Sequence, residues 1–171
     1  MNTNRHRPKD PFIAAYQIML EYIHAAIGQP GNRMLALRAD LELAREKALE
    51  LSELTREEIE HVATYLERDL HDAAIFIADT GKELKQWWQF DVQQVEENLL
   101  NMFSNVADQA SLQLHAFNEQ LQRLKIYQAG EVTGPGTLIC CNCACEQHFA
   151  VLGIIKPCAK CSNHKFQRIC S

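Results

Sequence analysis

Residues 137–149, TLICCNCACEQHF, contain four of the chain's seven cysteines, and the other three follow this stretch. Within it only Cys140 and Cys143 have C-x-x-C spacing, and downstream only Cys158 and Cys161 have it. Two intervening residues let the chain turn so that both sulfur atoms of a pair face one ion. Fourteen residues separate the two pairs, which is typical of structural zinc sites. The sequence therefore predicts one tetrahedral Zn²⁺ bound by these four cysteines.

Three cysteines and two histidines near the pairs are outside the predicted ligand set. Cys141 and Cys145 adjoin the first pair, and Cys170 is the penultimate residue of the sequence. His148 and His164 flank the pairs and are substitute ligands in principle, but four thiolates already fill a tetrahedron. We interpret Cys141 and Cys145 as spare thiols, with redox sensing as the alternative.

The segments around the cysteine pairs have the composition of short strands. Residues 137–139 lead into the first pair, residues 148–152 lie between the pairs, and residues 165–169 alternate in polarity after the second. Glycines cluster from Gly130 onward, which marks a domain boundary. The part of the chain after it is too short for a self-sufficient apolar core, so a metal is the expected staple. We predict a β zinc ribbon over residues 130–171.

The first 129 residues have the pattern of a helical domain. Between Gly31 and Gly130 the chain contains one glycine, Gly81, and no proline, as long helices require. One segment has a heptad pattern, at Met34, Leu37, Leu41, Ala44, Ala48 and Leu51. The predicted fold class is therefore mainly α: an elongated antiparallel helical bundle or coiled coil over residues 1–129, followed by the small C-terminal ribbon. We interpret the apolar stripes as core packing, with a self-association seam as the alternative.

Polar residues mark several expected helix starts. Asp10, followed by proline, is a predicted N-cap. Thr55 with Glu58 and Thr80 with Glu83 each have the spacing of a capping box. The sequence thus predicts three helix N-termini before residue 84.

Hydropathy and charge predict a cytoplasmic protein. No window of eighteen apolar residues exists, so no membrane span is expected. The run FIAAYQIML follows basic residues, but polar residues soon interrupt it at helical spacing, which favours an amphipathic helix over a signal peptide. Thiols stay reduced in the cytoplasm, where clustered cysteines are metal ligands more often than disulfides.

These residues are compatible with three classes of function. A filled four-thiolate site leaves no open position for activated water, and no catalytic triad or phosphate-binding loop stands out, so we expect a non-enzymatic protein without a small-molecule substrate. The main hypothesis is a protein-interaction or regulatory module, with partners or self-association through the helical region.

The alternatives are nucleic-acid binding through the ribbon, and a thiol redox sensor or rubredoxin-like iron site. The ribbon's charged residues are Lys156, Lys160, Lys165 and Arg168 against Glu131 and Glu146. Phe166 is a candidate for stacking on a base, although a buried ribbon aromatic is the preferred interpretation. The formal charge of −5 for the whole chain disfavours a general grip on phosphate backbones.

The run GEVTGPGTLICCNCACEQHF at residues 130–149, the second pair CAKC and the closing FQR resemble the C-terminal ribbon of the YbeL-like family of zinc-ribbon-containing proteins. The resemblance extends upstream to residues 53–57 and 68–70. It implies a helical body, a zinc ribbon with the same four cysteine ligands, and no established activity. Ala159 and Ser162 depart from the C-P-x-C-G form that such ribbons often have. We expect Asn163 to supply the left-handed turn that glycine would otherwise provide.

Overall fold

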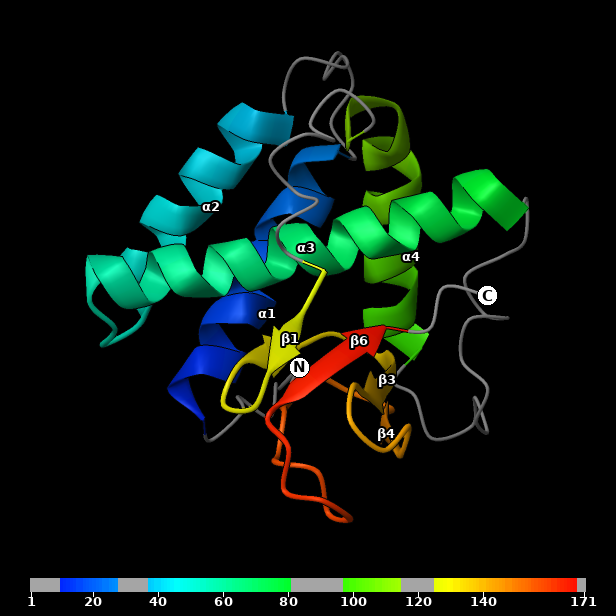
Figure 1. The fold of residues 1–171 in the computed structure, drawn as a ribbon. Helices are drawn as coiled ribbons and strands as arrows, with labels where there is room; N and C mark the ends of the chain where they lie inside the picture. Colours follow the sequence, from blue (N-terminus) through cyan, green and yellow to red (C-terminus); the bar gives the residue numbers. More distant parts are fainter. Residues whose placement is uncertain (1–9, 28–36, 81–96, 115–124, 169–171) are drawn as a thin grey trace.

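The computed structural model of the chain describes residues 10–27, 37–80, 97–114 and 125–168. In these residues helices come first and strands follow. The helices are α1 (Pro11–Ile27), α2 (Leu37–Leu51), α3 (Arg56–Thr80) and α4 (Glu97–Leu114). The strands are β1 (Tyr127–Gln128), β2 (Val132–Thr133), β3 (Gly136–Cys140), β4 (Glu146–Phe149), β5 (Gly153–Ile154) and β6 (Lys165–Arg168). The predicted order of a helical part and a C-terminal antiparallel sheet is confirmed (Figure 1).

Two helices begin at the predicted caps. The Asp10 carboxylate accepts the N–H groups of Phe12 and Ile13 at 2.9 and 3.2 Å, so that α1 begins directly after it. At α3, the Thr55 N–H donates to the Glu58 carboxylate at 2.8 Å, and the Glu58 N–H donates back to the Thr55 hydroxyl at 3.3 Å. This reciprocal pair is a capping box, and it fixes the start of α3.

Helix α3 lies across the other helices. Figure 1 shows it crossing α4 at a steep angle instead of running alongside it. Their shared core is made of apolar residues at helical spacing, among them Tyr16, Leu20, Leu66 and Phe103, all fully buried. The helical content is thus as predicted, whereas an elongated bundle or a coiled coil is not confirmed.

The strands form two antiparallel sheets. The larger has the order β1-β6-β3-β4, and the smaller pairs β2 with β5. The predicted strand over residues 148–152 differs from the observed one: β4 ends at Phe149, and β5 begins only at Gly153. Between them the chain bends, and Leu152 is buried against the helices instead of pairing in the sheet.

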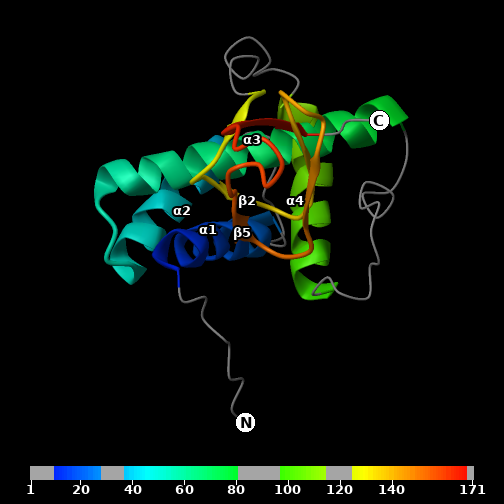
Figure 2. The ribbon, with the colours of Figure 1, turned by 60° about the horizontal axis from the view of Figure 1, so that its bottom comes forward.

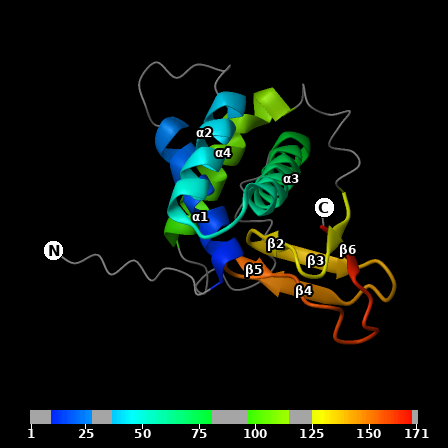
Figure 3. The same cartoon turned by 90° about the vertical axis from the view of Figure 1, so that its left-hand side faces the viewer.

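The small sheet and the helices share one core. Val132 of β2 and Leu152, before β5, belong to the same buried cluster as the residues of α1, α3 and α4. Figures 2 and 3 show the strands gathered on one side of the helices, with β2 and β5 close to α1. Strand β1 precedes Gly130, where the sequence places the domain boundary; the boundary stays a prediction.

Some sequence predictions concern residues that the structure does not describe. These are the basic N-terminal residues, the capping box that includes Glu83, and the thiol of Cys170. Among the helices in the described residues, none has the length and apolarity needed to cross a membrane.

Candidate metal centre

The two cysteine pairs fold into equivalent turns. In the first, the Ala144 N–H donates to the Cys140 carbonyl at 3.0 Å, and in the second the Ser162 N–H donates to the Cys158 carbonyl at 2.8 Å. Ala144 and Ser162 have φ angles of 57° and 58°, which is the left-handed region. These turns leave the two sulfur atoms of each pair on the same side of the chain. We call residues 140–144 and 158–162 the two knuckles.

The left-handed residue of the second knuckle is Ser162, and the prediction that Asn163 would take this role is wrong. Asn163 has a different part in the site. Its side-chain amide donates to the Cys140 sulfur at 3.5 Å and to the Lys165 carbonyl at 2.9 Å. Asn163 therefore connects the second knuckle to a ligand of the first, which its sequence position alone did not indicate.

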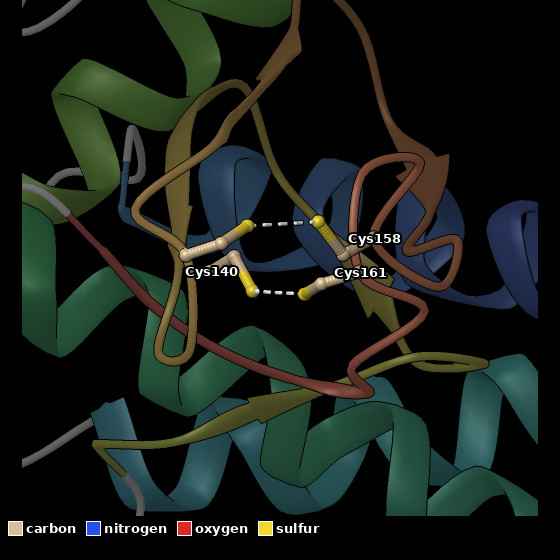
Figure 4. A group of neighbouring side chains, drawn as sticks. Cys140, Cys158 and Cys161 are labelled. Carbon is tan, nitrogen blue, oxygen red and sulfur yellow. Dashed lines mark hydrogen bonds between the residues drawn. The ribbon is translucent and has the colours of Figure 1, made fainter.

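The structure brings the four predicted ligands together. The sulfur atoms of Cys140, Cys143, Cys158 and Cys161 all lie within 4.8 Å of one another. Two distances across the knuckles, Cys140 to Cys161 and Cys143 to Cys158, are 3.5 Å, and Figure 4 shows sulfurs from the two knuckles facing each other. A tetrahedron with metal–sulfur bonds of about 2.3 Å has sulfur–sulfur edges of about 3.8 Å. The thiol set therefore fits one tetrahedral ion such as Zn²⁺.

Neighbouring groups give the thiols different proton affinities when no metal is bound. Burial raises the pKa of Cys140, but hydrogen bonds from the Asn142 N–H and the Asn163 amide outweigh this effect and lower the pKa to about 6. The Cys145 N–H lowers the pKa of Cys143, but burial and hydrogen bonds to the other three ligand thiols raise it to about 12. One ligand is thus a thiolate near neutral pH while another keeps its proton until a metal displaces it.

The remaining candidate residues lie outside this group of four sulfurs. Cys141 is exposed, and Cys145 is half-buried with its thiol near the Glu146 carbonyl. His148 lies on β4, where its Nδ1 is 2.9 Å from the Thr137 hydroxyl and its Nε2 is 3.3 Å from the Glu146 carboxylate. His164 is exposed. Among the described residues no histidine or carboxylate joins the four cysteines.

A second, smaller apolar core surrounds the knuckles. It contains the ligands Cys140 and Cys158 together with Tyr127, Leu138, Ile155 and Phe166. Phe166 is 1% exposed, so its ring is part of this core and cannot stack on a base from solution. We call this set the ribbon core.

Arg168, counted among the ribbon's charged residues from the sequence, is buried between the rest of the ribbon and α3. Its guanidinium donates to the Asp69 carboxylate at 3.0 Å and to the Thr133 hydroxyl at 2.6 Å. It also donates to the Pro135 carbonyl at 3.1 Å and to the Tyr127 hydroxyl at 2.9 Å. Burial lowers the pKa of Arg168, but Tyr127 and Asp69 raise it above its usual value, so the group stays charged.

Asp69 and Asp72 of α3 complete this buried network. The Asp69 carboxylate accepts the Tyr16 hydroxyl and the Gly134 N–H, both at 2.7 Å, and its side chain is fully buried. The Tyr127 hydroxyl donates to Asp72. Because Tyr16 belongs to α1, the network joins α1, α3 and the ribbon. The sequence gives no local signal for it, since Asp69 and Arg168 are 99 positions apart.

A neighbouring ion pair strengthens the same contact. The Arg68 guanidinium donates to the Glu131 carboxylate at 2.6 Å and lies 3.7 Å from the centre of the Tyr127 ring. Glu131 also accepts the Gln128 N–H at 3.0 Å, which fixes the loop between β1 and β2. Arg68, Asp69 and Asp72, which lie close together on α3, therefore hold ribbon residues by charge, hydrogen bonding and aromatic contact.

Comparisons with known proteins agree with the geometry. A family model described as "Zinc-ribbon containing domain" matches residues 29–169. The Escherichia coli protein named "Uncharacterized protein YbeL", in strains K12 and O157:H7 among others, is 27% identical over 128 residues, which are 75% of this chain and 79% of YbeL. The resemblance to YbeL-like proteins is thereby confirmed. No solved structure matches the chain.

Proposed function

Because the chain belongs to the family with the zinc-ribbon containing domain, we propose that it is a non-enzymatic protein whose ribbon binds one structural Zn²⁺. The convergence of four thiols within 4.8 Å is the observation that supports this proposal. The ion would be held by Cys140, Cys143, Cys158 and Cys161, and it would cross-link the two knuckles. Four sulfur ligands leave no open coordination position, which supports a structural and not a hydrolytic role.

Metal analysis of the purified protein tests this proposal. Elemental analysis should find about one zinc per chain in a colourless sample, whereas a red sample with iron would indicate a rubredoxin-like centre. Cys158→Ser should abolish stoichiometric binding, and Cys141→Ser is the matched control because that thiol is exposed and outside the group of four. Full zinc content in the Cys158→Ser protein would contradict the assignment.

We propose that the protein acts in the cytoplasm as an interaction or regulatory module, with protein partners or self-association through its helices. A ribbon fixed on a helical body supports this role, because it presents rigid loops: Asn142, Ala144 and Lys160 of the knuckles are exposed around buried ligands. Light scattering after gel filtration measures self-association. A strictly monomeric chain would leave recognition of other proteins as the role.

Partner recognition is tested by affinity capture with matched charge variants. A Lys156→Glu, Lys160→Glu double variant changes the ribbon, and Lys47→Glu changes the exposed face of α2. Specific partners lost with only one variant identify the face that binds them. Identical capture by both variants and the unmodified chain would contradict binding through either face.

Nucleic-acid binding is the second candidate function. Exposed lysines at positions 156, 160 and 165 support it, but the burial of Phe166 and Arg168 removes two residues that could have contributed. A gel-shift experiment with single- and double-stranded probes at low and moderate salt tests it. Absence of a shift at low salt would exclude this function.

A further inference from the structure

Strand β6 connects the metal centre to the buried network on α3. Phe166 belongs to the ribbon core with Cys140 and Cys158, and Arg168, two residues later, makes the ion pair with Asp69. In the sheet, Phe166 lies opposite Tyr127 of β1 on one side and Cys140 of β3 on the other. The position of Arg168 on β6 therefore depends on the pairing of β6 with β3 at Cys140, a predicted metal ligand.

Tyr127 makes the same connection from β1. Its ring is fully buried in the ribbon core, and its hydroxyl contacts both Asp72 of α3 and Arg168. The ribbon core contains few residues, and two of them are the ligand cysteines themselves. Loss of the metal would remove the cross-link between the knuckles and loosen both β1 and β6.

Loosening of these strands has a direct consequence for α3. The Asp69 side chain is fully buried; Arg168 is its hydrogen-bonded cation at 3.0 Å, and Arg68 is a second, more distant cation at 3.8 Å. Release of Arg168 would leave the buried carboxylate without its hydrogen-bonded cation and with only the more distant Arg68, which is unfavourable, so this part of α3 would open to water. Val132 and Leu152 would then also leave the helical core.

We propose that metal occupancy of the ribbon controls its docking on α3, with Arg168 and Asp69 as the coupling pair. With metal bound, Arg168 is held against Asp69 and the ribbon covers α3. When the metal is removed, β6 releases Arg168 and the covered face of α3 is exposed. The ribbon is thus a metal-dependent clamp on the helical body. This inference rests on the zinc site proposed above.

Hydrogen exchange on the full-length zinc-loaded chain tests the clamp. Excess EDTA should raise exchange of α3 amides around Asp69 by about tenfold or more, because the covering strands leave. Amides of α2, which Figure 3 shows on the side of the helices away from the strands, should change far less. A chromophoric chelator measures the zinc released in the same sample. Unchanged α3 exchange after complete zinc release would overturn the clamp.

A variant on α3 tests the coupling in the reverse direction. Docking and metal binding must affect each other equally, so weakening the ion pair must weaken zinc affinity. Asp69→Asn should raise the zinc dissociation constant by about tenfold or more, measured by chelator competition. Glu67→Gln is the matched control, because Glu67 is also a carboxylate of α3 paired with an arginine, but its partner is Arg45 of α2. Equal zinc affinity of the two variants would overturn the proposal.

Failure of the proposed zinc site and failure of the proposed clamp give different experimental results. A chain that binds no zinc overturns the proposed metal site and this inference with it. A chain that binds and releases one zinc without any change in α3 overturns the clamp and leaves the metal site intact. If Asp69→Asn does not fold, the exchange experiment on the unmodified chain decides the question alone.

Discussion

Ala144 and Ser162 hold the left-handed turns that close the two knuckles. Their φ angles of 57° and 58° are unfavourable for residues with a Cβ atom, at a cost of about 1–2 kcal/mol each. Each turn directs an N–H back to the first cysteine's carbonyl, which brings both sulfurs of the pair to one side. The knuckles therefore contain local strain that metal binding must offset.

Replacing the strained alanine by glycine should stabilise the zinc-loaded protein. Ala144→Gly removes the left-handed penalty of about 1–2 kcal/mol, and the greater freedom of glycine in the unfolded chain costs about 0.5–1 kcal/mol. A net gain of about 0–1.5 kcal/mol in the free energy of unfolding is therefore expected in denaturant unfolding. Ala159→Gly is the control, because Ala159 lies in the other knuckle without a positive φ. It should be neutral or destabilising. Equal effects of both changes would contradict the strain argument.

Zinc binding should weaken as the pH falls through about 6. The pKa of Cys140 is lowered to about 6 in the metal-free chain, so this ligand is a thiolate at neutral pH and becomes protonated below that value. Protons then compete with the metal, and affinity and metal-dependent stability are both lost in acid. Chelator-competition titrations from about pH 8 to about pH 5 measure this effect. Because Cys143 loses its proton to the metal throughout this range, affinity falls with pH everywhere, and a slope that does not become steeper below about pH 6 would contradict the role of Cys140.

Variants of two asparagines test which hydrogen bond lowers the pKa of Cys140. Asn163 donates its side-chain amide to the Cys140 sulfur, whereas Asn142 donates its backbone N–H. Asn163→Ala should therefore move the pH profile of zinc binding to higher pH. Asn142→Ala keeps its donor and should leave the profile unchanged. Overlapping profiles for the two variants would show that the amide of Asn163 does not act on Cys140.

At the scale of elements, the side chain of Arg168 from β6 lies directly against the backbone of Gly136, the first residue of β3. A Cβ atom added there would lie 2.1 Å from the Arg168 guanidinium, and Gly136 has a φ angle of 144°. Gly130 has a φ angle of 99°, but an added Cβ would meet open space. Gly130 is therefore favoured by its backbone conformation alone, whereas Gly136 is favoured both by its conformation and by the close approach of Arg168.

Gly136→Ala should destabilise the protein far more than Gly130→Ala. Both changes have a backbone cost of about 1–2 kcal/mol, because both residues have positive φ. Gly136→Ala also displaces Arg168 from Asp69, and breaking a buried ion pair costs about 3–5 kcal/mol. Unfolding in denaturant measures the difference. Similar losses for both variants would indicate that Arg168 moves aside without leaving its partners.

Elements were predictable where their signals are local. The Asp10 cap and the Thr55–Glu58 capping box act within three residues, so the starts of α1 and α3 follow from the sequence. The strand predicted over residues 148–152 was too long because its apolar residues serve two different cores. Phe149 packs against the ribbon core, whereas Leu152 packs against the helices. Periodicity identifies an apolar residue but not the core that receives it.

At the scale of the molecule, the candidate metal centre depends on local sequence signals, whereas the proposed clamp depends on residues that are far apart in the sequence. The four cysteines of the candidate metal centre form two local pairs with a recognisable spacing, so the sequence alone was enough to predict that they belong together. The Arg168–Asp69 pair joins residues 99 positions apart, and each has an ordinary exposed counterpart elsewhere in the chain. Nothing in the sequence distinguishes a buried arginine from a surface one. Only the docking of the ribbon on α3 does so.

Shared packing leads us to expect one cooperative unfolding transition for helices and ribbon. Val132 lies in one cluster with residues of α1 and α3, and Arg168 ties β6 to the same helices. The loss of helical circular dichroism and the release of zinc to a chromophoric indicator should therefore coincide in a denaturant titration. Separate transitions would show that the helical part and the ribbon are independent units.

Variants of two valines test whether the packing of the small sheet couples the unfolding of the helices to the release of zinc. Val132 is 1% exposed, whereas Val151 is 45% exposed. Val132→Ala should lower the free energy of unfolding by about 1–3 kcal/mol and shift the midpoints of both signals together to lower denaturant, because it removes methyl groups from the shared core. Val151→Ala should shift neither midpoint. If Val132→Ala lowers the helical midpoint and leaves zinc release unchanged, β2 belongs to the helical core alone, and the metal acts on the helices only through Arg168 and Tyr127.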